Sequence, residues 1–148
     1  MLTLKRTNSD DVDFKTLSAA LDKALAVVNG NDNDFFVQFN HVQIDQCVIC
    51  YSDNKPIGIG GFKLYDTGVA ELKRMFVDPA FRRKQVAVHI LTELEIWGKE
   101  LGFNTFVLET SVDLTAAMKF YQNAGYTAIE RYGQYANVES SRCMKKQI

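Results

Sequence analysis

The chain has 148 residues, 47% hydrophobic and 24% charged, and a net charge of −1, which is the composition of an ordinary soluble globular domain. This length allows a sizeable core and predicts one domain over residues 1–148. The near-neutral charge gives no reason to expect nucleic acid or a membrane as a partner, and no apolar run reaches the roughly 18 residues of a membrane span.

The N-terminus and the cysteines predict a reducing, cytoplasmic location. The opening residues alternate in hydropathy and then turn polar, unlike a signal peptide. The chain has an odd number of cysteines, Cys47, Cys50 and Cys143, which argues against a disulfide framework. Cys47 and Cys50 have redox or metal spacing, but they lie in an apolar run typical of a strand, with no second pair or nearby histidine. We therefore expect buried thiols and no metal site.

Hydrophobic periodicity divides the first half of the chain into a strand, two helices and a hairpin. Residues 2–7 alternate as a strand does, and Ser9 and the aspartates after it offer caps for a helix with apolar residues as far as Val28. Asn29 and Gly30 end that helix. The next elements are a short helix around Phe35, Phe36, Phe39 and Val42, and a hairpin of strands 47–51 and 57–65.

The second half contains a strand–helix–strand unit at residues 69–77, about 84–101 and 105–110. The crossover helix makes the two strands parallel. A helix over about 114–124 and strands over 126–132 and about 140–146 follow. The expected fold class is α/β (α+β): a mixed, mostly antiparallel sheet of about seven strands with one parallel pair and helices on both faces.

The segment from Glu71 to Ala87 carries the strongest chemical signal. A strand leads into three consecutive cations, Arg82, Arg83 and Lys84, and then into the first turn of a helix. Free backbone N–H groups and the positive end of the helix dipole make such a junction an anion site. The alternative is a merely solvated charge run. A nucleoside-triphosphate site is a poor hypothesis, because the chain has no Gly-x-x-x-x-Gly-Lys-Ser/Thr loop.

Three motifs, in order along nearly the whole chain, make it resemble the GCN5-related N-acetyltransferase (GNAT) superfamily. Residues 76–87 are similar to the family's strand–loop–helix with its Arg/Gln-x-x-Gly-x-Gly/Ala loop, and residues 119–126 to its leucine–tyrosine…glycine–phenylalanine segment. The pair Glu71-Leu-Lys-Arg-Met-Phe-Val77 and Leu108-Glu-Thr110, with Tyr132-Gly-Gln-Tyr135, resembles a bacterial branch of small-molecule acetyltransferases. The departures are Gln85, in place of a glycine, and Leu114, where an asparagine is often found.

The resemblance implies acetyl-CoA as co-substrate, bound where strands 69–77 and 105–110 splay apart, often helped by a bulge in the first strand. The backbone of Met75, Phe76 and Val77 would pair with the pantetheine arm like an added strand and supply an oxyanion donor. Gln85 can donate its N–H to the pyrophosphate if its φ stays negative; the alternative is that it has spoiled the site. The full set expected around the pyrophosphate is Arg82, Arg83, Lys84, Gln85, Val86, Ala87 and Val88.

The resemblance also implies direct attack of an amine on the thioester in a ternary complex. Glu71 has the spacing of a family base, six residues before Val77, and we expect both on one strand face. Pairing of Glu71 with Lys73 or Arg74 on a solvent-facing strand is the alternative reading. Glu109 is the reserve base.

The remaining candidates come from the second motif and from the walls of the acceptor site. Tyr121 matches the family tyrosine that protonates the coenzyme A sulfur, with a core aromatic as the alternative. His41 is an acceptor-site candidate, whereas His89 is expected on a helix surface. Tyr132 and Tyr135 are expected to close the acceptor side.

These features together predict an N-acetyltransferase for a small-molecule amine. The alternative is a non-catalytic acyl-CoA-binding sensor or regulatory module of the same fold, which Gln85 and Leu114 favour. Family members often dimerise through edge strands, so the resemblance makes a homodimer possible.

Overall fold

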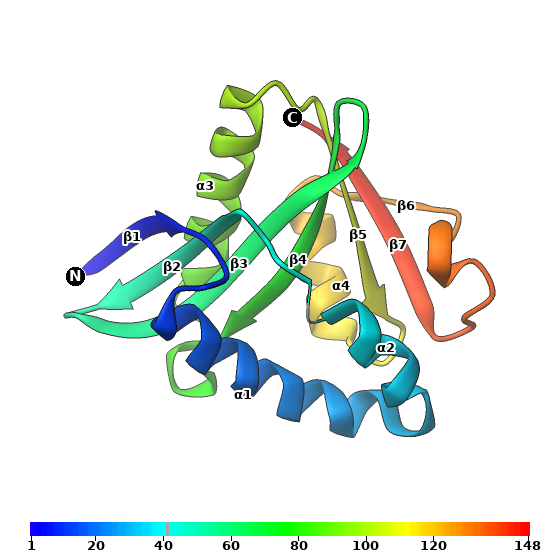
Figure 1. Ribbon diagram of the computed structural model, residues 1–148, viewed down its shortest axis with the longest axis horizontal. Helices are drawn as coiled ribbons and strands as arrows, with labels where there is room; N and C mark the ends of the chain where they lie inside the picture. The colour runs from blue at the N-terminus through cyan, green and yellow to red at the C-terminus, as the bar shows by residue number, and fades with distance from the viewer. Residues whose placement is uncertain (41) are drawn as a thin grey trace.

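The protein is described here by a computed structural model that covers residues 1–40 and 42–148, with only the backbone of Phe39 and Asn40. Seven strands form one sheet in the order β1-β2-β3-β4-β5-β7-β6 (Figure 1). Only β4 and β5 pair in parallel among the strands of these ranges, which confirms the expected fold class. The main elements are β1 (Leu2–Thr7), α1 (Val12–Asn29), α2 (Asn33–Asn40), β2 (Gln46–Ser52), β3 (Lys55–Asp66), β4 (Val69–Val77), α3 (Val86–Glu100), β5 (Thr105–Ser111), α4 (Thr115–Asn123), β6 (Thr127–Ile129) and β7 (Ser141–Gln147).

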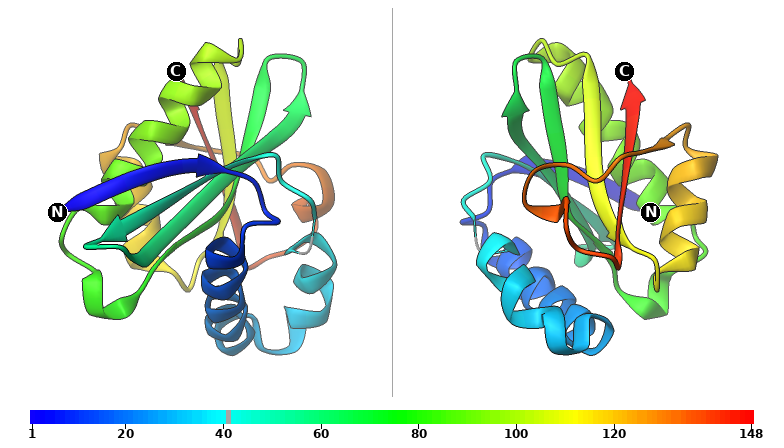
Figure 2. Two further views of the ribbon diagram at one scale, coloured as in Figure 1. Left: turned by 60° about the vertical axis from the view of Figure 1, so that its left-hand side comes forward. Right: turned by 90° about the vertical axis from the view of Figure 1, so that its right-hand side faces the viewer.

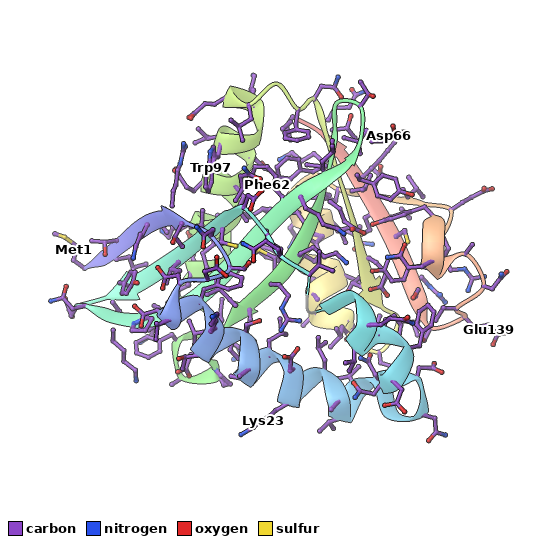
Figure 3. All side chains as sticks on the ribbon, in the orientation of Figure 1. Met1, Lys23, Phe62, Asp66, Trp97 and Glu139 are labelled. Carbon is purple, nitrogen blue, oxygen red and sulfur yellow. The ribbon has the colours of Figure 1, made fainter. Side chains whose placement is uncertain are left out.

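Helices cover both faces of the sheet. The helices α1 and α2 lie on one face, and α3 and α4 lie on the other (Figures 1 and 2). The core on the α3 side includes Phe62, which meets Trp97 edge to face with ring centroids 5.9 Å apart (Figure 3). No helix in the described part of the chain is long and apolar enough to cross a membrane.

Local chemistry sets most of the element boundaries. The side chain of Asp11 caps α1 by accepting from the backbone N–H groups of Asp13 and Phe14, and Gly30 ends the helix with a φ of 53°. The strand expected over residues 126–132 is wrong in length. It stops at Ile129, because the chain then turns into a 3₁₀ segment at Gly133–Tyr135.

A β-bulge interrupts β4 opposite β3. Ile59 pairs with Phe76, but Gly61 pairs with Lys73, so β4 holds one extra residue there, and Arg74 has a φ of +61°. Because of the extra residue, side chains after the bulge point to the opposite face from the one that simple alternation would give. Leu72 and Val77 both join the core on the α3 side.

The bulge therefore overturns one expectation from the sequence. Glu71 alternates with Ala70 and Leu72, which belong to the α3-side core, so it faces the α1 side. Val77 faces α3, so Glu71 and Val77 do not share a face. Simple alternation along the strand fails because a bulge shifts the side-chain register by one residue.

The strands β4 and β5 are paired over only a short length. Their recorded pairs are Val69–Thr105, Ala70–Phe106 and Glu71–Val107. Beyond these pairs the strands diverge toward their C-terminal ends, as Figure 1 shows. The splayed junction expected from the sequence is therefore present.

Two glycines of β3 let the start of α3 approach the sheet closely. A Cβ at Gly58 would lie 2.8 Å from Ile90 and 2.9 Å from Val86, and one at Gly60 would lie 2.9 Å from Ile90. Such distances exclude larger residues unless the helix moves. The glycines thus place the N-terminus of α3 beside the end of β4.

We expect Gly58→Val to lower the free energy of unfolding by about 1–3 kcal/mol, because the added methyl groups overpack the contact with α3. Urea unfolding measures the change. Ala128→Val, on the exposed surface of β6, is the control and should change stability by less than about 0.5 kcal/mol. Equal effects of the two variants would contradict this role for Gly58.

Candidate active site

A cavity of about 170 Å³ lies where β4 and β5 separate, and we call it the central cavity. Glu71, Lys73 and Met75 line it from β4, Glu109 from β5 and Tyr121 from α4. Its other walls are Leu21, Leu25, Asn29, Phe36, Leu72, Arg74, Leu108, Thr110, Ser111, Leu114, Ala117 and Tyr135. Both predicted catalytic residues, Glu71 and Tyr121, therefore meet in one space.

Glu71 is held firmly by two neighbours. Its side chain is buried, with 2% exposure. The hydroxyl of Tyr132 donates to Oε2 at 2.7 Å, and Nζ of Lys73 lies 3.5 Å from Oε1. Lys73 also donates to the hydroxyl of Tyr135 at 3.2 Å. The pairing with Lys73 that we left open is present, but inside the cavity wall rather than on a solvent-facing strand.

Glu109 is the second carboxylate of the central cavity. Burial raises its pKa from the usual 4.5 to about 7, against the opposing effects of a hydrogen bond from Ser141 and the charge of Lys73. The hydroxyl of Ser141 donates to Oε2 at 2.8 Å. No residue in the described ranges donates to Oε1. Since every fully buried side-chain oxygen in those ranges has a partner, Oε1 is not fully enclosed, and Glu109 lines the central cavity.

Tyr121 also lines the central cavity. The ring packs edge to face against Phe120 and Tyr126, which fixes its position, and the residue is 8% exposed. Burial raises the pKa of Tyr121 above its usual range. The hydroxyl therefore stays protonated at neutral pH and is able to donate a proton.

A second cavity, of about 280 Å³, lies at the start of α3, and we call it the loop cavity. Its walls are Val77, Phe81, Arg82, Arg83, Gln85, Val86, Ala87, Val88 and Phe120. Most residues expected around the pyrophosphate therefore gather there. Lys84 is exposed, with Nζ 5.4 Å from the ring centre of Phe81.

The backbone around the loop cavity differs from the conformation expected at Gln85. Gln85 has φ 62° and ψ 19°, the left-handed region, and Arg83 has φ 65°. The condition set for Gln85, a negative φ, is therefore not met, and Gln85 takes a backbone conformation that favours glycine. The N–H groups of the first turn of α3 have no earlier helical turn to bond to, whatever the conformation of Gln85.

We expect Gln85→Gly to raise the free energy of unfolding by about 0.5–1 kcal/mol, because glycine removes the left-handed strain at a smaller cost in backbone entropy. Gln85→Ala removes the side chain but keeps Cβ, and should give no such gain. Chemical denaturation of both variants tests the expectation. A gain in the alanine variant equal to that in the glycine variant would assign the cost to the side chain instead.

The other candidates from the sequence lie at different distances from the central cavity or outside the described residues. Tyr135 lines the central cavity. Tyr132 is not among the lining residues but donates a hydrogen bond to Glu71, which is. Phe76 turns its side chain into the core on the α1 side. His41 and the side chain of Phe39 lie outside the described residues.

The sequence did not indicate the two residues that contact the carboxylates of the site, Lys73 beside Glu71 and Ser141 beside Glu109. Lys73 appeared there only as part of a charge cluster or as a surface partner of Glu71, and Ser141 carried no signal at all. Lys73 lies on the same face of β4 as Glu71 and is buried beside Tyr135, a contact between distant residues that leaves no local mark in the sequence. Arg74 itself is held by α1, donating to Asp22 at 2.6 Å and to the side chain and carbonyl of Ser18.

Comparison with protein families gives one match. The model of the acetyltransferase (GNAT) family matches residues 17–126, well over half of the chain. Among solved structures, a protein of Klebsiella pneumoniae assigned as an acyl-CoA N-acyltransferase superposes with a TM-score of 0.84 and 25% identity, over 99% of this chain and 97% of that one.

Two curated relatives match shorter segments. IAA acetyltransferase of Azospirillum brasilense is 30% identical over 94 residues, 62% of this chain and 61% of that protein. Aminoglycoside N(6')-acetyltransferase type 1 of Acinetobacter genomosp. 13 is 30% identical over 63 residues, 43% of each chain. The chain thus spans less than two thirds of either relative.

Proposed function

This chain belongs to the acetyltransferase (GNAT) family, and we propose that it transfers the acetyl group of acetyl-CoA to a primary amine of a small molecule by direct attack in a ternary complex. The family predicted from the three motifs is confirmed. The observation that carries the proposal is the meeting of Glu71, Glu109 and Tyr121 in the gap between β4 and β5.

We place the coenzyme between the central cavity and the loop cavity, since β4 lines both of them. The edge of β4 that faces the gap, at Met75, Phe76 and Val77, has no ladder with β5 beyond Glu71, so it offers backbone groups to the pantetheine amides. The pyrophosphate would lie at the first turn of α3, at Val86, Ala87 and Val88. Arg82, Arg83, Lys84 and Gln85 would add charge and donors beside it.

The chemistry follows from where the protons go. An alkyl ammonium must first lose a proton, and we assign Glu71, directly or through a water molecule, as the base that takes it. The amine then attacks the thioester carbon, and a backbone N–H of the β4 edge stabilises the oxyanion. As the carbon–sulfur bond breaks, Tyr121 gives its proton to the sulfur and recovers one from the acetylated nitrogen. The products are an amide and coenzyme A.

A thiol-release assay with acetyl-CoA tests the proposal against alkylamines, polyamines, aminoglycosides, amino acids and peptide N-termini. We expect amine-dependent thiol release and an acetylated product by mass spectrometry. Thermal stabilisation by coenzyme A without transfer to any amine would replace the enzyme with a coenzyme-binding module.

A further inference from the structure

Resting on the proposed function, we infer that the acceptor is a primary monoamine with an apolar carbon skeleton, and that Glu109 is the residue that binds its ammonium group. This selects one class among the amines named above. The inference rests on three features of the central cavity: its charge balance, the carboxylate oxygen of Glu109 that has no donor among the described residues, and its apolar walls.

The charges of the central cavity leave one carboxylate unmatched. Four charged side chains line the cavity. Arg74 is paired with Asp22 at 2.6 Å, and Lys73 lies 3.5 Å from Glu71. Glu109 remains, and its closest polar partner is the neutral hydroxyl of Ser141. Burial raises the pKa of Glu109 to about 7, and an ammonium group bound beside it would favour the ionised carboxylate and be balanced by it.

The position of Oε1 identifies where that charge binds. Both oxygens of Glu71 already have partners, Lys73 and Tyr132. In Glu109, Oε2 accepts from Ser141, whereas Oε1 has no donor in the described ranges and is not fully enclosed. An ammonium group forms its strongest hydrogen bonds with such a carboxylate oxygen. Glu109 therefore anchors the amine close to Glu71, which takes the proton.

The walls and charges exclude other amines. Leu21 and Leu25 of α1 and Phe36 of α2 line the side facing these helices, which suits an alkyl or aryl group. A polyamine or aminoglycoside would bring further ammonium groups to a cavity with one unmatched carboxylate. An α-amino acid would bring a carboxylate, whereas Lys73 and Arg74 are already paired.

A matched set of acceptors tests the class. We compare kcat/KM for hexylamine and 2-phenylethylamine with that for 1,6-diaminohexane, leucine and an aminoglycoside. We expect the two monoamines to exceed each of the others by at least tenfold. A preference for the diamine, leucine or the aminoglycoside overturns this inference but leaves the proposed function intact. Thiol release with none of the amines overturns both.

Two variants test the residue roles. Glu109→Gln keeps an acceptor for Ser141 but loses the charge, and should raise KM for hexylamine about 10- to 100-fold with kcat changed less than threefold. Lys73→Met leaves Glu71 unmatched, and should reduce the preference for hexylamine over diaminohexane at least fivefold. Lys145→Met, at an exposed position, is the control.

Thermal stabilisation by coenzyme A shows that each variant is folded. A fall in kcat of Glu109→Gln with an unchanged KM would make Glu109 a base rather than the binding group, and would overturn the inference. An unchanged acceptor preference in folded Lys73→Met would do the same.

Discussion

Glu71→Gln should lower kcat for acetyl transfer by about 100- to 10,000-fold, the usual range for loss of a general base. The amide still accepts the hydrogen bond of Tyr132 but is unable to take a proton from the ammonium group. Steady-state kinetics with acetyl-CoA and the best amine measure the effect.

The matched control is Glu130→Gln, at an exposed position between β6 and the next turn, which should retain full activity. Coenzyme A should still stabilise Glu71→Gln against heat, because Glu71 is not among the residues that line the loop cavity. Wild-type kcat in this variant would leave Glu71 as the structural partner of Lys73 and Tyr132.

Glu109→Gln should stabilise the protein at pH 8 by about 3 kcal/mol relative to pH 4. The folded pKa of about 7 exceeds the usual 4.5, so between these pH values the folded protein holds a proton that the unfolded chain has lost. Stability of the wild type therefore falls as pH rises through this window and is level above it. Glutamine does not titrate, so the variant escapes the fall.

Four ionisable groups surround Glu109. Glu71 and Lys73 face it from β4, Tyr135 from the segment after β6, and Cys143 from β7. Burial lowers the pKa of Lys73 and raises that of Tyr135 and Cys143 further above neutral. Urea unfolding at pH 4, 6 and 8 measures the difference, with Glu130→Gln as control. A pH-independent difference would contradict the raised pKa of Glu109.

Interactions close in the sequence were predictable. The alternation of β1, the caps of α1 and the strand–loop–helix from β4 to α3 follow from local preferences, because their determinants lie within a few residues. The parallel pair followed from the crossover rule. The prediction of an anion site at residues 82–88 needed only their position at the start of a helix.

The arrangement of the cavity depended on distant contacts. Ser18 and Asp22 of α1 bind the side chain of Arg74, which has a left-handed backbone conformation. Tyr135 contacts Lys73 and Tyr132 contacts Glu71 from the segment after β6. Ser141 and the burial of Glu109 set the pKa of that carboxyl. None of these effects acts between neighbours in sequence, so no local pattern encodes them.

The sequence alone thus determined the family, the order of the elements and the junction from Glu71 to Ala87, since periodicity and turn chemistry act locally. The tertiary structure decided which carboxylate is already paired and which keeps an oxygen with no donor in the described part of the chain. It also showed Gln85 in the backbone conformation of the glycine that it replaces. Charge pairing, burial and strain depend on residues that only folding brings together.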